Sequence, residues 1–267
     1  MADAFVKYLA IHVGHTRVKI GLFEVDKLST EFNCLNTFSI ELEEEFPWNE
    51  IKSDNVNCSQ VISIITGSNR IRSKELQFNW NNHFQEPLFL EHNSSIPVKN
   101  LVEVPEKVGA DRLLNTAAVN KLKREDSSAI IVDSGTAITV DAVSQRGEFL
   151  GGAILPGVLM GARAMHDFTT TLPMIDGKKY LDAPPAAIGK NTEDAMASGL
   201  YWGHLGAVKE LVDRIQNELG ENSQLFLTGG ATPLLQSYLT EAKVEPCLSL
   251  IGSIITAKAM LSASITK

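Results

Sequence analysis

The sequence is poor in features that mark several classes of protein. Only three cysteines occur among 267 residues, and they stand far apart at Cys34, Cys58 and Cys247. An odd, widely spaced set of this kind builds neither a disulfide framework nor a zinc cluster. No apolar run reaches the roughly 18 residues of a transmembrane helix, and residues 1–7 lack a long apolar core. We therefore expect a cytoplasmic protein that has no membrane partner.

The chain also has fewer basic than acidic residues. Lysine and arginine number 24 against 32 aspartates and glutamates, so the net charge is −8 and the pI is about 5.3. This balance argues against nucleic acid as a partner, because surfaces that neutralise phosphates carry an excess of Lys and Arg. The apolar content of 44% over this length is enough for one large domain or two modest ones. A small-molecule partner is therefore expected.

Two similar strand–turn–strand patterns occur in the chain. The first breaks at Gly14 and the second at Gly135, and aligning the two glycines places His12 on Asp133, 121 residues later (133 − 12). That spacing is too long for a solenoid repeat and suits a duplicated domain, although two unrelated glycine hairpins also look alike. The flanking strands are predicted over residues 8–13, 18–23, 129–132 and 137–143.

Further elements follow from the apolar pattern. A helix is predicted to open near residue 110 or 111, because apolar residues recur there at steps of three and four. The stretch 29–57 is irregular, and its acidic run 41–45 is expected to be a solvated face. The long amphipathic segment 195–219 suits a dimer interface or an interdomain core equally well. Other predicted elements are strands at 60–66, 87–90 and 225–227 and a helix at 250–265.

Glycine turns that follow strands suit anion binding. Backbone N–H groups can approach an anion closely there, a threonine adds a hydroxyl donor, and an acidic residue at the strand end can hold a metal that bridges phosphates. A third such turn is Thr228-Gly229-Gly230-Ala231, between a strand and a helix. Two facing turns would clamp the phosphates of a nucleotide. Each turn alone is a weak signal, because most glycine turns are only turns.

Taken in order, the three turns resemble the acetate and sugar kinase, heat-shock 70 and actin superfamily. The segments between them are similar to type III pantothenate kinase, and the likeness runs from about residue 8 to residue 252. Its specific segments are Gly109-Ala110-Asp111-Arg112 and Val132-Asp133-Ser134-Gly135-Thr136-Ala137, followed by Thr139 and Asp141. It also includes the glycine-rich run 151–157, the segment 188–192, and Ser198-Gly199.

The resemblance implies an α/β fold with two duplicated ribonuclease-H-like (actin-like ATPase) domains. Each would have a mixed sheet, with a nucleotide cleft between the domains. The first domain would span residues 1–123 and the second 124–246, and a helix within 247–267 would pack back on the first. Members of this family transfer the γ-phosphoryl group of ATP to the terminal hydroxyl of pantothenate, the first step of coenzyme A biosynthesis. They use Mg²⁺ and a monovalent cation, K⁺ or NH₄⁺, and act as homodimers.

The resemblance also implies roles for individual residues. Asp111 would accept the proton of the alcohol, and Asp133 would bind the monovalent cation. The residues expected to bind ATP are His12, Val13, Gly14, His15, Thr16, Arg17, Val18, Lys19, Thr136, Gly229 and Gly230. Those expected to bind pantothenate are Gly109, Ala110, Asp111, Arg112 and, from the neighbouring subunit, Thr192.

Plainer interpretations of these residues remain open. Asp111 and Thr192 could simply cap helices, and Asp133 could initiate a turn. Arg112 could be a solvated residue on a helix surface. Gly151, Gly152 and Gly157 are expected to shape a turn.

The sequence departs from the family pattern at His12. The family has an aspartate there that helps to hold Mg²⁺, and usually an asparagine at the position of His15. Magnesium prefers carboxylate and water oxygens, so imidazole is a poor replacement. His12 could position the metal through water or, when protonated, neutralise phosphate, and either would give a weakened kinase. Alternatively, the protein is a catalytically impaired homologue that acts as a nucleotide- or pantothenate-binding protein or as a regulatory protein. A kinase for another small alcohol is a lesser option.

A second departure lies before Gly109. The family often has a tyrosine a few residues upstream, whereas this chain has Val102-Glu103-Val104-Pro105. This departure therefore bears on the affinity for pantothenate, whereas the departure at His12 bears on the chemistry.

Overall fold

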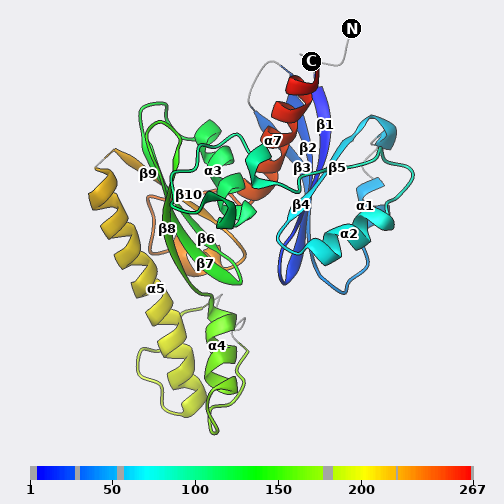
Figure 1. Ribbon diagram of the computed structural model, residues 1–267. Coiled ribbons are helices and arrows are strands. Elements are labelled where there is room, and N and C mark those ends of the chain that lie inside the picture. Colours follow the sequence, from blue (N-terminus) through cyan, green and yellow to red (C-terminus); the bar gives the residue numbers. More distant parts are fainter. Residues whose placement is uncertain (1–4, 28–30, 53–56, 177–182, 221, 266–267) are drawn as a thin grey trace. The chain divides into compact units, whose positions relative to one another are not determined.

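The computed structural model describes the chain except for residues 1–4, 28–30, 53–56, 177–182, 221 and 266–267 (Figure 1). By its internal contacts the chain divides into two compact units. Unit 1 comprises Met1–Lys99, Glu103–Leu122 and Cys247–Lys267, and unit 2 comprises Asn100–Val102 and Lys123–Pro246.

Unit 1 is built on a mixed five-stranded sheet with the order β3-β2-β1-β4-β5. Its strands are β1 (Phe5–Val13), β2 (Arg17–Asp26), β3 (Phe32–Glu41), β4 (Ile62–Gly67) and β5 (Leu88–Phe89). Strand β2 pairs antiparallel with both β1 and β3, whereas β4 pairs in parallel with both β1 and β5. The central strand β1 is buried from Tyr8 to Val13, which explains its nearly continuous apolar run. The carboxyl ends of β1, β4 and β5 therefore meet at one edge of the sheet.

Strand β3 corrects the expectation that residues 29–57 are irregular. The strand pairs Asn36 with Leu22 but Cys34 with Phe23, so Leu35 is an extra residue on the edge strand. A bulge of this kind shifts the alternation of side chains by one position, which hides a period of two from any count along the sequence. The helix α1 (Trp48–Lys52) also falls within this stretch. The acidic residues at 41 and 43–45 are exposed, as expected for a solvated face.

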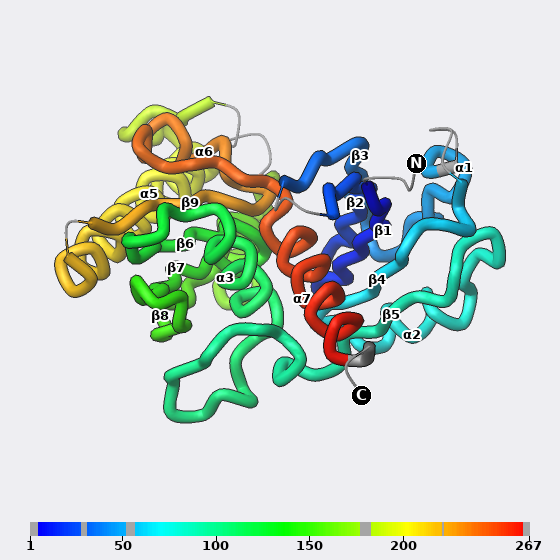
Figure 2. The backbone as a smooth tube through the Cα atoms, turned by 90° about the horizontal axis from the view of Figure 1, so that it is seen from above, coloured from blue at the N-terminus to red at the C-terminus, as the bar shows by residue number. Residues whose placement is uncertain are grey.

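Helices cover both faces of the first sheet. The apolar core cluster around Leu9, Ile11 and Ile65 includes Ile51 of α1, and Leu76 of α2 packs against it. The helices α3 and α7 pack on each other and α7 packs on β1 and β4 (Figure 2). Bounds of the remaining helices of unit 1 are α2 (Arg70–Phe78), α3 (Ala110–Leu122) and α7 (Leu248–Ile265), with short 3₁₀ turns at Cys58–Gln60, Asn93–Ser95 and Pro105–Lys107. The predicted helices at 110 and 250–265 are confirmed.

Unit 2 repeats the same sheet. Its order is β8-β7-β6-β9-β10, again with three antiparallel strands followed by two parallel ones. The strands are β6 (Ser128–Ser134), β7 (Ala137–Val143), β8 (Phe149–Pro156), β9 (Ser223–Thr228) and β10 (Lys243–Val244). Each strand of unit 1 thus has a counterpart in the same place and direction, which confirms the predicted α/β class with two duplicated mixed sheets.

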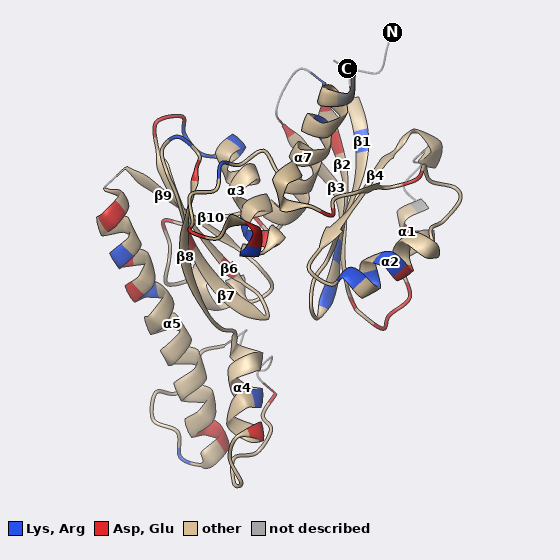
Figure 3. Ribbon diagram, in the orientation of Figure 1, with Lys and Arg blue, Asp and Glu red and all other residues tan. Residues whose placement is uncertain are grey.

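The long helix α5 (Thr192–Leu219) provides much of the second core. Its buried residues, among them Met196, Leu200 and Val208, lie in one apolar cluster with Ile130 and Val140 of the sheet. The buried face of segment 195–219 therefore packs within unit 2, while its charged residues lie on the outer face (Figure 3). The other helices of this unit are α4 (Val158–Asp167) and α6 (Thr232–Gln236). No helix in the described ranges has the length and apolar character needed to cross a bilayer.

Candidate active site

Each sheet carries a glycine hairpin at the end of its central strand. In unit 1 the N–H of Gly14 donates to the carbonyl of Arg17 at 2.9 Å, and in unit 2 the N–H of Gly135 donates to the carbonyl of Ala137 at 3.1 Å. Two residues lie between donor and acceptor in the first hairpin, His15 and Thr16, but only Thr136 in the second. The loop of the first hairpin is therefore one residue longer than that of the second. The alignment of His12 with Asp133 is unaffected, because both residues precede the loop.

A second pair of matching glycines lies on the neighbouring parallel strand. Thr66 is the register partner of His12, and Thr228 is the partner of Asp133. Gly67 and Gly229 follow these threonines, and each then leads into a helix. Thr66-Gly67 was not among the anion-binding turns predicted from the sequence, which included only the later copy at 228–231. Aligning the TGS at 66–68 with the TGG at 228–230 would have found it.

Hydrogen bonds confirm that the two copies have the same backbone path. The N–H of Asn69 donates to the carbonyl of Val13 at 3.3 Å, and the N–H of Ala231 donates to that of Ser134 at 2.9 Å. In both cases the donor lies two residues after the glycine and the acceptor is the last residue of the central strand. This hydrogen bond connects the turn at Gly67 in unit 1, and the turn at Gly229 in unit 2, to the helix that follows. We call each of these turns, together with the hairpin beside it, the glycine corner of its sheet.

Only glycine fits the first position of these corners. Gly67 has φ +143° and Gly229 has φ +97°, in the region that side chains rarely adopt. A Cβ on Gly67 would overlap the backbone of Val13, and one on Gly229 would lie 2.5 Å from the carbonyl oxygen of Ser134. Gly230 differs, because open space surrounds the place of its Cβ. The close approach of strand and turn therefore rests on Gly67 and Gly229.

His12 and Asp111 meet at the edge of the first sheet. His12 is 5% exposed on the central strand, and Asp111 lies in the first turn of α3. The Nε2 atom of His12 is 3.2 Å from Oδ1 of Asp111, an ion-pair distance. Within the described chain, Nδ1 of His12 and Oδ1 of Asp111 are buried without a well-aligned hydrogen bond. Buried polar atoms in this state point to a ligand or water that completes the site.

The charges around Asp111 keep it ionised. Burial raises the pKa of its carboxyl group, but the charge and close contact of His12 and the charges of Lys19 and His15 outweigh that effect. The pKa of Asp111 is therefore lowered below its ordinary value. Lys19 is the antiparallel partner of His12 on β2, so both side chains project from the same face of the sheet. An ionised carboxylate at this place can accept a proton.

The other residues of the motif at 109–112 form the start of α3. Gly109 is exposed, and its carbonyl accepts the N–H of Arg112 at 3.2 Å. The Arg112 side chain is half-buried rather than fully solvated. Asp111 faces His12 rather than serving only as a helix cap, although a negative charge in the first turn also suits the helix dipole.

In unit 2 the carboxylate at the end of the central strand, Asp133, lies between two glycines of the glycine corner. Oδ1 of Asp133 is 2.6 Å from the place where a Cβ on Gly229 would stand and 3.7 Å from that place on Gly135. Thr136, at the tip of the hairpin, is half-buried. Asp141 on β7 is fully buried, and its Oδ2 accepts the hydroxyl of Thr139 at 3.0 Å. The second corner thus gathers carboxylates where the first corner gathers basic groups.

The expected turn at Gly151 and Gly152 is wrong. Both residues lie within β8, where Gly151 has φ +114° at a bulge opposite Ala142 and Val143. Gly152 pairs with Asp141, and a Cβ there would lie 2.7 Å from Oδ1 of Asp141. Gly152 therefore makes room for a buried carboxylate, and Gly151 has a backbone conformation that favours glycine. No local pattern of turn residues could indicate either feature.

Gly157 lies against the second hairpin instead. Its N–H donates to the carbonyl of Thr136 at 3.1 Å, and a Cβ on it would lie 2.6 Å from the carbonyl oxygen of Gly135. It is also the N-cap of α4. The tip of the hairpin is thus held by a glycine from the next element.

Thr192 is the first residue of α5 and is exposed. The cap of this helix is Asn191, whose Oδ1 accepts the N–H of Asp194 at 2.8 Å. The interpretation of Thr192 as the N-cap is therefore wrong by one residue. Its hydroxyl is not used in capping and lies at the surface.

The side chains of the site fit the expected monovalent cation better than they fit Mg²⁺. No group of three or more His, Cys, Asp or Glu in the described ranges could enclose a metal ion. Mg²⁺ prefers oxygen, so a site with imidazole at position 12 and one carboxylate, Asp111, does not fit direct coordination by the protein. A monovalent cation fits better beside Asp133, where a carboxylate lies among backbone carbonyls of the glycine corners.

Solved structures share this arrangement of two duplicated sheets. A Baf-family protein from Campylobacter jejuni aligns with a TM-score of 0.55 at 19% identity and covers 95% of this chain and 99% of its own. Component A of the (R)-2-hydroxyglutaryl-CoA dehydratase of Acidaminococcus fermentans aligns with a TM-score of 0.52 at 13% identity, covering 96% of this chain and 99% of its own. At such identities the likeness shows the fold alone, which is that of the two-domain actin-like ATPases.

Sequence comparison narrows this class to one family. The family model for type III pantothenate kinase matches residues 8–214. The type III pantothenate kinase of Dehalococcoides mccartyi strain CBDB1 is 35% identical over 242 residues, which is 86% of each chain. The chain therefore belongs to the type III pantothenate kinase family, a family of phosphotransferases, and the resemblance read from its motifs is confirmed.

Proposed function

We propose that the protein phosphorylates pantothenate with ATP to give 4′-phosphopantothenate, the first step of coenzyme A biosynthesis. The observation that carries this proposal is the ionised carboxylate of Asp111, held 3.2 Å from His12 within the family's specific motif. Phosphoryl transfer asks the protein mainly for positioning, for charge neutralisation and for a group that takes the proton of the alcohol. Asp111 supplies that last group.

The reaction then proceeds as an in-line transfer. The terminal hydroxyl oxygen of pantothenate forms a bond to the γ-phosphorus of ATP, and its proton passes to the carboxylate of Asp111. The bond between the γ-phosphorus and the oxygen that bridges to the β-phosphate breaks, and ADP leaves. Arg112, whose planar fork suits bidentate contact, binds the acceptor or a phosphate oxygen.

The remaining roles complete this proposal. Residues 12–19, Thr136, Gly229 and Gly230 bind ATP, whose phosphates meet the N–H groups of the glycine corners. Asp133 binds the monovalent cation, K⁺ or NH₄⁺. Residues 109–112 bind pantothenate together with Thr192 of a second subunit in a homodimer. Each unit is one actin-like ATPase domain, and the enzyme works in the cytoplasm.

His12 sets the expected strength of the activity. Mg²⁺ bound with ATP would neutralise phosphate charge, but at position 12 the protein offers imidazole where the family has a carboxylate. Loss of one metal-positioning group costs on the order of 10² to 10³ in rate. We therefore infer a weakened kinase. The alternative is a catalytically impaired homologue that binds nucleotide or pantothenate without turning it over, which the buried contact between His12 and Asp111 would also permit.

A coupled ADP-release assay distinguishes these functions. The wild type should release ADP with pantothenate in the presence of Mg²⁺ and K⁺, and a panel of sugars and other small alcohols should give no release. Saturable binding of ATP and pantothenate by calorimetry, with no ADP formed, would favour the binding protein. Release with a sugar but not with pantothenate would overturn the proposed substrate.

A further inference from the structure

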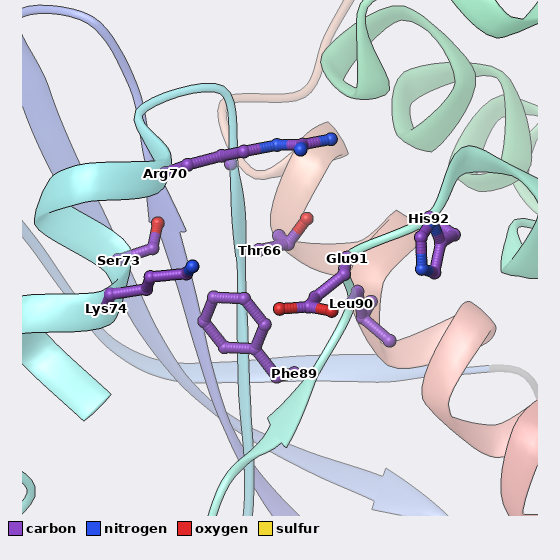
Figure 4. A pocket seen from close by; sticks show the side chains of 9 residues that line it. Thr66, Arg70, Ser73, Lys74, Phe89, Leu90, Glu91 and His92 are labelled. Atoms are coloured by element: carbon purple, nitrogen blue, oxygen red, sulfur yellow. The ribbon is translucent and has the colours of Figure 1, made fainter. Parts of the chain in front are cut away.

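The glycine corner of unit 1 borders a small cavity and an exposed ion pair. The cavity measures about 200 Å³, and its lining includes Thr66 and Ser73 beside the parallel strand β4 (Figure 4). On the hairpin side, Arg17 of β2 and Glu41 of β3 are register partners, and their exposed side chains form an ion pair at 3.6 Å. Exposed ion pairs add little stability, so these side chains hold the hairpin of unit 1 only weakly.

Unit 2 has a different link at the corresponding place. The counterpart of that register pair is Ala137 of β7 with Pro156 of β8. The carbonyl oxygen of Pro156 lies 2.8 Å from Nε2 of His204, on helix α5. The other ring nitrogen of His204, Nδ1, lies 2.5 Å from the carbonyl oxygen of Leu200, one turn earlier in the same helix. A half-buried histidine thus joins the long helix to the last residue of β8.

Both contacts of His204 require the ring to act as a hydrogen-bond donor. A carbonyl oxygen only accepts, and a neutral imidazole carries a hydrogen on one of its nitrogens only. A ring with hydrogens on both nitrogens satisfies both carbonyls at once, and hydrogen bonds from such a charged ring are stronger than neutral ones. His204 therefore fits its place as a double donor, and the bond from Nε2 is the one that reaches another element.

Helix α4 makes room for the His204 ring. A Cβ on Gly161, one turn into this helix, would lie 2.8 Å from Cδ2 of Leu200 and 3.5 Å from Cε1 of His204. The N–H of Gly161 also donates to the carbonyl of Gly157 at 2.8 Å, which ties the start of α4 to the end of β8. The position of the ring is therefore fixed by the neighbouring helix as well as by its two hydrogen bonds.

The residue after Pro156 carries this link to the hairpin of unit 2. The N–H of Gly157 donates to the carbonyl of Thr136, at the tip of the hairpin, at 3.1 Å. A Cβ on Gly157 would overlap the same carbonyl oxygen, so the two backbones are in direct contact. A single peptide, that of residues 156–157, therefore lies between the His204 ring and the hairpin.

We propose that His204 is a positioning residue for ATP: its Nε2–H bond to Pro156 holds residues 156–157 against the hairpin and so fixes Thr136 where a phosphate oxygen binds. The inference rests on the proposed function, which assigns Thr136 to ATP, and adds a residue that touches neither substrate. A hairpin that is already held in place loses less conformational freedom when the nucleotide binds. Loss of the link should weaken ATP binding and leave Asp111, which belongs to unit 1, unchanged.

The test uses two substitutions that separate the two contacts of the ring. In His204→Gln the side-chain amide reaches about as far from the backbone as Nε2, so it can still donate to Pro156. In His204→Asn the amide reaches only about as far as Nδ1, so the bond to Pro156 is lost. The matched control is Trp202→Phe on the same helix. It removes a bond from Nε1 of Trp202 to the carbonyl of Pro185 at 3.1 Å, which does not lead to the hairpin.

His204→Asn should raise the KM for ATP about fivefold, the effect of losing one hydrogen bond of ordinary strength. Its kcat and its KM for pantothenate should stay within about twofold of the wild type. His204→Gln and the control should keep the wild-type KM for ATP, whereas a general loosening of unit 2 would affect both substitutions at position 204 alike. A wild-type KM in His204→Asn, or an equal rise in His204→Gln, would overturn the role of His204 while leaving the kinase in place.

Hydrogen exchange at the amide of Gly157, measured by NMR, gives a readout that needs no turnover. Because this N–H donates to Thr136, it should exchange about fivefold faster in His204→Asn than in the wild type, and at the wild-type rate in His204→Gln. Unchanged exchange in His204→Asn would overturn the link. Should His204→Asn not fold, His204→Gln decides alone: wild-type exchange and KM support the role of Nε2, and a rise in either overturns it.

Calorimetry with ATP separates failure of the positioning role from failure of the kinase. If the wild type releases no ADP, weaker ATP binding by His204→Asn together with faster exchange at Gly157 would support His204 and overturn the kinase. Equal ATP binding by the wild type and His204→Asn would overturn the positioning role. No binding of ATP by the wild type would overturn both.

Discussion

The two glycine hairpins lie at the same place in their sheets but carry different charged groups. Both central strands end in a turn whose glycine donates back to the second strand, and both lie beside a threonine–glycine pair. In unit 1 the strand-end residue is His12, which faces Asp111 from a helix; in unit 2 it is Asp133, which lies among the glycines themselves. Duplication thus preserved the backbone geometry, while the charged groups at the strand ends diverged.

The difference suggests a division of labour between the two corners. Around Asp111, the groups His12, Lys19 and His15 lower its pKa, which keeps a base ionised. In unit 2 the carboxylates of Asp133 and Asp141 face backbone and hydroxyl groups, an arrangement that suits a cation. We propose that the site at the first corner supplies the base that takes the proton and that the second corner binds the cation that balances the phosphate charge.

The largest effect is expected from Asp111→Asn, which removes the base of the first corner. The amide keeps the shape of the side chain but cannot accept the proton, so kcat should fall by a factor on the order of 10² to 10⁴. The assay is ADP release at saturating ATP and pantothenate. Glu125→Gln, at an exposed position, is the control and should match the wild type. Unchanged turnover in Asp111→Asn would assign the base elsewhere.

The next prediction tests whether both units need glycine at the turn after the parallel strand. Alanine at Gly67 or Gly229 adds a Cβ where backbone atoms already lie and at φ above +90°. Each should lower the free energy of unfolding by about 3 kcal/mol. Gly230→Ala, with open space around it, should change stability by less than about 0.5 kcal/mol. Urea denaturation measures all three, and equal stability of Gly229→Ala and Gly230→Ala would refute the close approach.

A smaller effect is expected when the first corner is made to resemble the second. His12→Asp supplies the carboxylate oxygen that Mg²⁺ prefers, so turnover in saturating Mg²⁺ should rise by about tenfold. Without the metal, two carboxylates would lie side by side, and the melting temperature of this variant should therefore depend on Mg²⁺ more steeply than that of the wild type. His12→Asn has the same shape without the charge and should show neither change. A loss of turnover in His12→Asp would mean that the contact with Asp111 matters more than the metal.

The smallest effect concerns pH. A carboxyl group with a lowered pKa in the folded state adds stability above its unfolded pKa of about 3.9, and this stability is lost as the pH falls through the folded value. His12→Gln removes the main group that lowers the pKa of Asp111 and should raise that pKa. Because the Asp111 side chain is 36% exposed, the loss should stay below about 1 kcal/mol. Unfolding in urea should show the full difference near pH 6, and the difference should shrink as the pH falls below about 4. A difference that stays constant as the pH is lowered would contradict this origin.

The sequence was sufficient for the repeated part of the fold. The hairpins at Gly14 and Gly135, the strand before Thr228 and the helix at 110 all carry strong local patterns, and all were found where predicted. Strand β3 was missed because its bulge at Leu35 interrupts the alternation. Gly152 was misread because its small size makes room for the buried Asp141 on another strand, and Gly151 because its positive φ belongs to a bulge within β8.

The candidate site was only partly predictable. Family motifs identified His12 and Asp111 separately, but their contact joins residues 99 positions apart (111 − 12) and depends on how α3 lies at the edge of the sheet. Thr66 lay in a predicted strand, and its importance comes only from its register with His12.

The most direct test of the proposed function is ³¹P NMR of a reaction that contains ATP, pantothenate, Mg²⁺ and K⁺. The wild type should produce the phosphomonoester resonance of phosphopantothenate together with ADP, and Asp111→Asn should produce neither on the same timescale. A wild type that forms no phosphomonoester, or a variant that forms it equally fast, would contradict the assignment of Asp111 as the base of a pantothenate kinase.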